Sequence, residues 1–303
     1  MINNNLNDNY EQLMNYALRL YYRDSEEDNN GLIAVYEEYF QDYLKSVDCI
    51  NFKGQYEKIF EPFIQRASNS SSRLLKIYAY ANKGYFLNCI GDYPKAIEFN
   101  EKALELCEKE FKKDNVVKIN VMSNLADGYA NNIDIDNPYL FNQFEKALKL
   151  RKKVLSFRRR TFGEKHPETI SIMADVADSY RWVGNFIEAV KFGRKVLSLY
   201  KTVLGETNPY TIYARMNLSS YLYGLAEDNK RKEVYEEILE LDEETLELSK
   251  NVFGENNPDT IDAMITVAND LTFLGIDEER ADDLNRKVTE YFSEMENDYS
   301  SEE

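Results

Sequence analysis

The sequence predicts an all-α protein, a right-handed α-solenoid of about five helix pairs behind an N-terminal helical cap. A nine-residue motif occurs three times, as Phe162-Gly-Glu-Lys-His-Pro-Glu-Thr-Ile170, Leu204–Ile212 and Phe253–Ile261. A degenerate copy, Phe111–Ile119, completes a series with start-to-start spacings of 51, 42 and 49 residues. Self-similarity at such a period is typical of stacked repeats, and apolar residues at helical spacing occupy the stretches between the copies.

Each copy of the motif has the chemistry of a junction between two helices. An apolar residue ends one helix, and a glycine follows where a helix C-terminus favours a left-handed residue. A proline then opens the next helix, because the first helical turn needs no N–H from it. We expect the glycines to have positive φ and the prolines to begin helices. These residues are Gly163, Gly205, Gly254, Pro167, Pro209 and Pro258.

The chain divides into three predicted parts. Residues 1–70 contain three helical patterns and no junction motif, so we expect a cap that covers one end of the solenoid. The third of these patterns, 55–67, contains Pro62, which should kink or shorten it. Residues 72–297 hold the repeats, and residues 298–303 form an acidic tail.

The repeats resemble tetratricopeptide repeats, which are pairs of antiparallel helices held close by small residues. Gly84, Gly91, Tyr93, Ala96 and Ala103 stand at the spacings of that repeat, and residues 182–190 repeat the turn. The 42-residue period and the Gly-Glu-x-x-Pro-x-Thr junction resemble the long repeats of kinesin light chain. The resemblance covers about 72–297, and it implies that Ala96 and Ala189 are buried between paired helices.

Two repeats are longer than the others. The turn that follows Tyr129 has about nine extra residues, and the turn that follows Gly224 has about seven. Insertions in a solenoid fall in loops on one face, so we expect both segments to protrude as loops from the same edge.

Composition narrows the function classes. The chain has 54 acidic and 37 basic residues, a net charge of −17, which disfavours nucleic acid and anionic membrane as partners. No apolar run approaches the ~20 residues of a membrane span, and no secretory signal is visible at the N-terminus. Cys49, Cys89 and Cys107 lie at no ligand spacing and indicate reduced thiols in a cytoplasmic protein.

Nothing in the sequence indicates an enzyme, a cofactor or a metal. His166 is the only histidine, and it stands in a junction where Asn208 and Asn257 occupy the same place in the other copies. A role in the turn therefore explains it better than catalysis. Without a second histidine or a Cys–His pair, the chain lacks the groups that nucleophilic or metal catalysis requires.

The strongest functional signal is a polar stripe along the first helix of each pair, where tetratricopeptide domains form a concave groove. Its members recur one helical turn apart, and asparagine is common among them although it is a poor helix former. Asparagine amides pair with both N–H and C=O groups of an extended backbone, so the stripe predicts peptide binding rather than a plain solvated face. We define the polar stripe as Tyr78, Asn82, Tyr85, Asn120, Asn124, Asp127, Asn131, Ser171, Asp175, Asp178, Trp182, Tyr213, Asn217, Ser220, Asp262, Thr266 and Asn269.

The charge of the stripe indicates the kind of partner. It contains Asp127, Asp175, Asp178 and Asp262 and neither lysine nor arginine. Tetratricopeptide domains that clamp a carboxylate place bases there, so we expect this stripe to disfavour acidic ligands. The predicted partner is a protein or peptide segment that is extended and neutral to basic.

One helix, 145–160, is basic, with eight bases and one acid. Its apolar stripe places the bases on the outer, convex side. They either form a solvated face that balances an acidic protein or dock an acidic partner or the acidic tail.

These features indicate a non-enzymatic scaffold that binds a partner segment in the concave groove. The alternative is a peptide-sensing regulatory protein. Bacterial peptide-pheromone receptors also join N-terminal helices to tetratricopeptide repeats, and residues 1–70 would then be an effector module. The sequence leaves the oligomeric state and the identity of the partner open.

Overall fold

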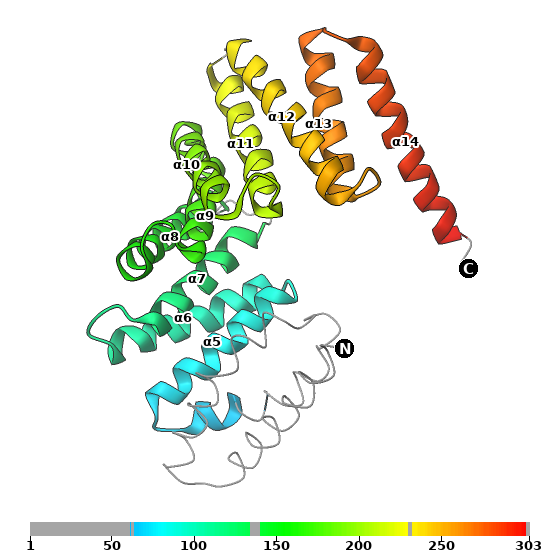
Figure 1. Cartoon of the computed structure of the whole chain (residues 1–303). Coiled ribbons are helices and arrows are strands. Elements are labelled where there is room, and N and C mark those ends of the chain that lie inside the picture. Colours follow the sequence, from blue (N-terminus) through cyan, green and yellow to red (C-terminus); the bar gives the residue numbers. More distant parts are fainter. Residues whose placement is uncertain (1–60, 62–63, 134–139, 230–231, 301–303) are drawn as a thin grey trace. The chain divides into compact units, whose positions relative to one another are not determined.

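The computed structural model describes residues 61, 64–133, 140–229 and 232–300 (Figure 1). Most of the predicted cap, 1–70, lies outside these residues, as does Pro62. Of the cap, residues 64–69 are helical. The chain forms two compact units, Met1–Phe157 and Arg158–Glu303.

Every element in the described part of the chain is an α-helix, as the sequence predicts. The first unit contains α5 (Arg73–Cys89), α6 (Tyr93–Glu110), α7 (Val116–Asn131) and most of α8 (Leu140–Phe162). The second contains α9 (Pro167–Trp182), α10 (Phe186–Leu204), α11 (Pro209–Asn229), α12 (Lys232–Phe253), α13 (Pro258–Leu274) and α14 (Glu278–Ser300).

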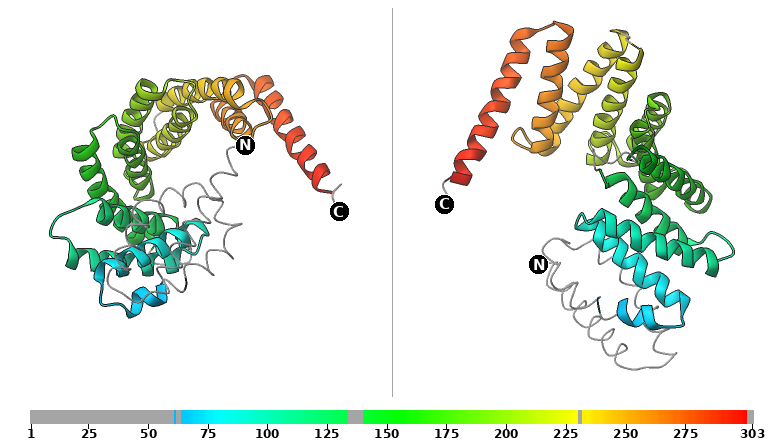
Figure 2. Two further views of the ribbon diagram at one scale, coloured as in Figure 1. Left: turned by 60° about the horizontal axis from the view of Figure 1, so that its bottom comes forward. Right: turned by 180° about the vertical axis from the view of Figure 1, so that it is seen from behind.

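Helices pack against their neighbours in chain order. In the second unit each helix from α9 to α14 contacts the next, and the views in Figure 2 show them side by side. In the first unit α5 contacts α6 and α6 contacts α7. The first helices of successive pairs also meet, since α5 contacts α7 and α9 contacts α11. This nearest-neighbour packing confirms the all-α solenoid.

The repeated motif forms the junctions between helix pairs, as predicted. Gly163, Gly205 and Gly254 have φ of 87°, 91° and 94°, and the three prolines begin α9, α11 and α13. Gly205 also has ψ of 165°. It therefore lies not in the left-handed helical region but in an extended region that only glycine enters readily.

The residue before each proline caps the helix that follows. Nδ1 of His166 accepts a hydrogen bond from the backbone N–H of Glu168 at 3.3 Å. Asn208 Oδ1 and Asn257 Oδ1 make the equivalent bonds to Tyr210 and Asp259 at 3.0 and 2.9 Å. The predicted role of His166 in the turn is confirmed, because its ring accepts the capping hydrogen bond that an asparagine side chain accepts at the other two junctions.

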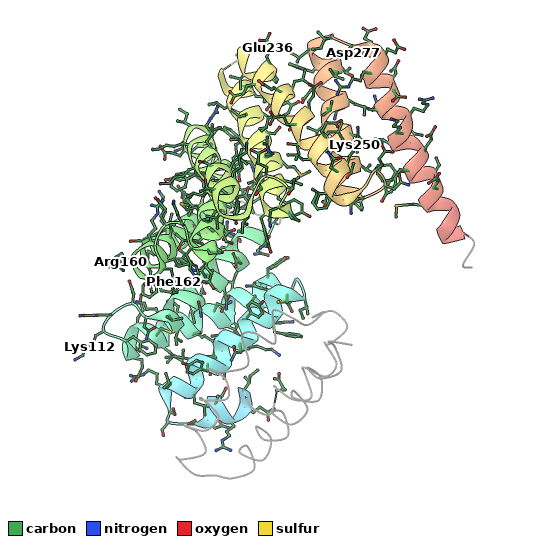
Figure 3. The ribbon with its side chains drawn as sticks, in the orientation of Figure 1. Lys112, Arg160, Phe162, Glu236, Lys250 and Asp277 are labelled. Carbon is green, nitrogen blue, oxygen red and sulfur yellow. The ribbon has the colours of Figure 1, made fainter. Side chains whose placement is uncertain are left out.

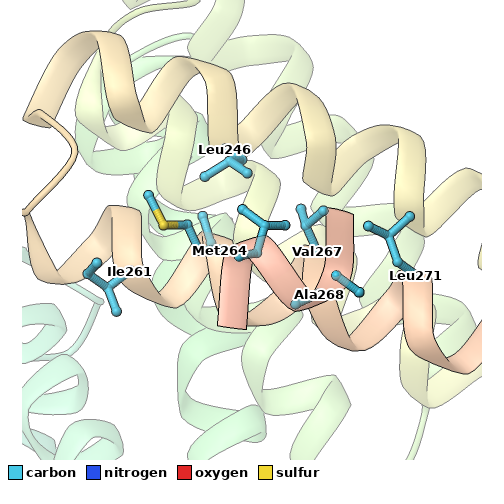
Figure 4. Close-up of a cluster of buried hydrophobic side chains, with 9 residues drawn as sticks. Leu246, Ile261, Met264, Val267, Ala268 and Leu271 are labelled. Carbon is cyan, nitrogen blue, oxygen red and sulfur yellow. The ribbon is translucent and has the colours of Figure 1, made fainter. Parts of the chain in front are cut away.

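Small residues bring the paired helices together. Ala96 and Ala189 are completely buried, as the resemblance implies. Apolar side chains then fill the space between neighbouring helices. Figure 4 shows one such cluster, formed by α12, α13 and α14, in which Leu246, Met264 and Leu271 are at most 2% exposed.

The predicted loop after Gly224 is wrong. α11 continues to Asn229 and α12 begins at Lys232, so the extra residues lengthen the helices. Leu225-Ala-Glu-Asp-Asn229 contains good helix formers and neither glycine nor proline, so no residue ends the helix earlier. Most of the extra residues after Tyr129 fall in 134–139, outside the described residues.

At the C-terminus, α14 continues to Ser300, into the segment 298–303 expected to be a tail. Residues 301–303 lie outside the described part of the chain. Among the described residues, no helix is long and apolar enough to cross a membrane.

We predict that Gly205→Val destabilises the protein by about 1 kcal/mol or more, because a β-branched residue strains a backbone with positive φ. An added Cβ meets no atom within 4 Å, so strain and not crowding causes the loss. Urea denaturation measures it. Thr202→Ala, in the exposed last turn of the same helix, is the control and should cost nothing. Equal stability of both variants would contradict the assignment of this helix end.

We predict that Ala189→Leu costs roughly 1–3 kcal/mol, because the added methyl groups have no space between α9 and α10. Ile187→Leu is the matched control two residues earlier, at a side chain that is 68% exposed, and it should be neutral. Thermal melts followed by circular dichroism compare the two. A neutral Ala189→Leu would show that the small residue does not set the packing of the pair.

Candidate functional site

The polar stripe lies on α5, α7, α9, α11 and α13, the first helix of each pair. Two of its members, Tyr78 and Asn82, are buried, with 7% and 8% exposure. The half-buried members are Tyr85, Asn120, Asn124, Asp127, Asp175, Asp178 and Thr266, and the exposed ones are Asn131, Ser171, Trp182, Tyr213, Asn217, Ser220, Asp262 and Asn269.

In the first unit a base meets the stripe, which the sequence alone did not indicate. Arg151 on α8 is 7% exposed, and its guanidinium lies 3.0 Å from Oδ1 of Asp127. The stripe contains no arginine of its own, but the second helix of the pair supplies one. The expectation that the bases of 145–160 lie on the outer side is therefore wrong at Arg151, which is buried beside a stripe residue.

Asp178, in the second unit, is also partnered. The hydroxyl of Tyr221 donates to its Oδ1 at 3.1 Å, and the Arg181 side chain lies 3.6 Å away. Tyr221 fits there because Gly193 on α10 faces its ring, where a Cβ would come within 2.9 Å. Burial and the neighbouring carboxylate raise the pKa of Tyr221, so its hydroxyl remains a donor.

Tyr213 connects two first helices. Its hydroxyl donates to Asp259 at the start of α13 at 2.7 Å, and its ring stacks on Phe253 with centroids 6.1 Å apart. The hydrogen bond raises the pKa of the Tyr213 hydroxyl. Tyr213 therefore supports the junction between α12 and α13.

A pocket of about 580 Å³ is lined by residues of α11, α12 and α13. Three members of the polar stripe, Ser220, Thr266 and Asn269, line it together. We call it the α11–α13 pocket. Its lining residues are Met216, Ser219, Ser220, Tyr223, Asp242, Thr245, Ala263, Thr266, Asn269 and Phe273.

Two aromatic side chains of the pocket are held by a third. Tyr235 on α12 packs against Tyr223 with centroids 5.8 Å apart and against Phe273 at 4.5 Å. Phe273 is nevertheless 64% exposed. A ring that is fixed on one side and exposed on the other offers a contact surface to a ligand.

Asp242 is a buried carboxylate in the lining of this pocket. It is 3% exposed, and its Oδ2 accepts a hydrogen bond from the Ser219 hydroxyl at 2.6 Å. Burial raises the pKa of the Asp242 carboxyl to about 6, although the hydrogen bond from Ser219 acts in the opposite direction. Its Oδ1 has no protein donor among the described residues.

Asp242 is absent from the predicted stripe because it lies on the second helix of its pair. It stands four residues after Ile238, the position that Ala96, Ala147 and Ala189 occupy in three of the other pairs. The same offset gives Asn100, Arg151 and Gly193. A polar residue at this offset interrupts an apolar stripe, and that interruption is the signal that could have found it.

Two arginines of the basic helix make contacts that hold the fold together. Within the second unit, the Arg158 guanidinium donates to the backbone oxygen of Glu168 at 3.1 Å, and Arg159 pairs with Glu164 at 3.4 Å. These two arginines brace the junction that precedes α9. Arg160 is exposed at the end of α8 (Figure 3).

The two described cysteines are not in a disulfide. Cys89 is half-buried and Cys107 is buried, and burial raises the pKa of the Cys107 thiol to about 12. A thiol with such a pKa is unreactive near neutral pH. Cys49 lies outside the described residues.

Comparisons with known proteins agree with this geometry. Two models described as tetratricopeptide repeat match the chain, one over 140–202 and the other over 77–116 and 211–259. A search of curated proteins finds no sequence match.

Several solved structures share the fold. The nearly identical repeats of a putative kinesin light chain from Podosopora anserina have 16% sequence identity to this chain, with a TM-score of 0.58 over 73% of this chain and 96% of that one. A Rap protein in complex with Competence and Sporulation Factor is 13% identical, with a TM-score of 0.55 over 96% and 79%. NprR in complex with its cognate peptide NprX is 14% identical, with a TM-score of 0.53 over 96% and 78%.

A second buried carboxylate gives a prediction about pH. Asp270 on α13 is 2% exposed, neither oxygen has a partner among the described residues, and burial raises the pKa of its carboxyl from 3.8 to about 7. The folded protein therefore holds a proton that the unfolded chain releases between about pH 4 and pH 7, so Asp270 makes the protein less stable as pH rises through this window.

We predict that Asp270→Asn increases the free energy of unfolding at about pH 8 by at least about 1 kcal/mol and changes it little at about pH 4, where the carboxyl is neutral. Asp262→Asn, an exposed position on the same helix, is the control and should be neutral at both pH values. Urea denaturation at the two pH values measures the difference. A gain that is the same at both would show that the charge of Asp270 is not the cause.

Proposed function

Since the chain belongs to the tetratricopeptide repeat family, we propose that it is a non-enzymatic scaffold that binds an extended segment of a partner protein or a peptide along the polar stripe. The partner segment is neutral to basic. Nucleic acid and membrane are not its partners, and it acts in the cytoplasm. Residues 72–297 form the binding solenoid, with 1–70 as its cap and 298–303 as an acidic tail.

The observation that carries this proposal is the α11–α13 pocket. Hydroxyl and amide groups of Ser220, Thr266 and Asn269 line it together. An amide such as that of Asn269 both donates and accepts, so it can pair with the backbone of an extended ligand. The exposed ring of Phe273 adds apolar contact beside these polar groups.

The solved structures add support. The Rap and NprR structures that share this fold were obtained with a bound factor and a bound peptide. A peptide ligand is therefore compatible with this arrangement of helices. At 13% and 14% identity the ligand itself does not carry over to this chain.

The same two structures favour the alternative function, a peptide-sensing regulatory protein. They cover 96% of this chain, whereas the kinesin light chain repeats cover 73%. In that case residues 1–70 act as an effector module rather than a cap. Hydrogen exchange distinguishes the two, because peptide binding to a sensor changes protection in 1–70 whereas binding to a scaffold leaves it unchanged.

A selected peptide tests the proposed function. A random peptide library is panned on the full chain, and one recovered peptide is synthesised with a fluorophore for anisotropy titration. We predict that Asn217→Ala with Asn269→Ala weakens binding by about tenfold or more, because a backbone group of the ligand loses its partner. Both side chains are exposed, so the fold should tolerate the change.

Two controls locate the site. Asn251→Ala removes an exposed asparagine from α12, a second helix, and should leave the affinity unchanged. Arg160→Ser removes an exposed base from the end of the basic helix and should also leave the affinity unchanged. Weaker binding in either control, with unchanged binding in the double variant, would move the site to the second helices and reject the polar stripe.

A further inference from the structure

The α11–α13 pocket contains an unbalanced charge. Among the described residues that line the pocket, Asp242 is the one acid, and none is a lysine, arginine or histidine. The Ser219 hydroxyl satisfies Oδ2, while Oδ1 has no donor among the described residues. The carboxylate is only 3% exposed, so little water is available to Oδ1, and a donor inside the pocket can replace that water.

The carboxylate carries its charge near neutral pH. Burial raises the pKa of the Asp242 carboxyl to about 6. Above that value most molecules are ionised. The pocket therefore presents a negative charge inside a largely apolar wall, where electrostatic attraction is stronger than in water.

The aromatic side chains that line the pocket also favour a cation. Tyr223 and Phe273 both line the pocket, and both rest on Tyr235. The face of an aromatic ring attracts a lysine or arginine head group within about 6 Å. A volume of about 580 Å³ leaves room for a long side chain.

Other occupants fit less well. An apolar side chain would cover Asp242 and leave its Oδ1 without any donor, which is the costly arrangement for a buried charge. An acidic side chain would add repulsion. A cation supplies both the missing donor and the missing charge.

We propose that the α11–α13 pocket receives the cationic side chain of a lysine or arginine residue in the bound segment, with Asp242 as its acceptor and Tyr223 and Phe273 beside it. This inference rests on the proposed function for the segment to which that side chain belongs. The chemistry of the pocket itself can be tested without any peptide.

The first test uses n-butylguanidinium, which reproduces an arginine side chain, and neutral n-butylurea. The full chain is labelled with ¹³C in the methionine methyl groups, because Met216 lines the pocket. Met216→Leu assigns that signal, and the fully buried Met173 on α9 is the internal reference. We expect n-butylguanidinium to shift the Met216 signal in a saturable way, and n-butylurea to bind at least about tenfold more weakly.

Asp242→Asn is the decisive variant. Asparagine keeps an oxygen that can accept the hydrogen bond from Ser219, so the local structure should survive the loss of charge. We expect it to weaken n-butylguanidinium binding by at least about tenfold. Asp282→Asn removes the same charge from an exposed position on α14, outside the polar stripe and the pocket lining, and should change binding less than about twofold.

A second variant keeps the test decisive if Asp242→Asn fails to fold. Phe273→Leu alters a side chain that is 64% exposed and should fold normally. It should weaken binding about two- to fivefold through the lost ring face, whereas Phe273→Tyr should preserve binding. Equal binding of urea and guanidinium, no saturable shift at Met216, or no effect of either Asp242→Asn or Phe273→Leu would overturn the proposal.

The two proposals fail in different ways. If the panned peptide binds and replacement of each of its lysine and arginine residues in turn by norleucine changes nothing, the cation pocket is wrong and the scaffold remains. If n-butylguanidinium binds at Asp242 and panning recovers no peptide, the scaffold is wrong and the cation pocket remains.

Discussion

The close contact of two helices within each pair is the constraint on which the other features depend. Ala96, Ala147 and Ala189 are at most 1% exposed, so the paired helices meet at these positions with little side chain between them. The residue one turn later on the second helix must then face the same interface. That geometry is why Arg151 and Asp242, charged residues on second helices, are buried at the site rather than exposed on the outside.

The fold could be predicted from the sequence because local rules determine the junctions. Positive φ requires glycine at residues such as Gly205, and a capping side chain followed by proline starts the next helix, as at Asn257. The segment after Gly224 could not be predicted in this way. A count of extra residues does not distinguish a loop from a longer helix, and with no breaker in 225–229 the helix continued.

The site could be predicted only in part, because spacing along a helix indicates a face but not what lies opposite that face. One-turn spacing predicts the stripe positions, and Ser220, Thr266 and Asn269 do lie together. Whether a stripe residue is available to a ligand depends on other helices. Arg151 from α8 pairs with Asp127, and Asp259 at the start of α13 accepts from Tyr213.

These partners change where the negative charge of the stripe can act on a ligand. At Asp127 and Asp178 a nearby arginine already offsets the carboxylate, so a basic ligand gains little there. Asp242 and Asp270 are both buried, and no base among the described residues pairs with either. They differ in access, because Asp242 lines the α11–α13 pocket and Asp270 does not. An unpaired charge with no access can only lower stability. A buried charge beside an open pocket can instead pair with a cation of the ligand. Binding then removes the free-energy cost that the unpaired charge imposes on the folded protein.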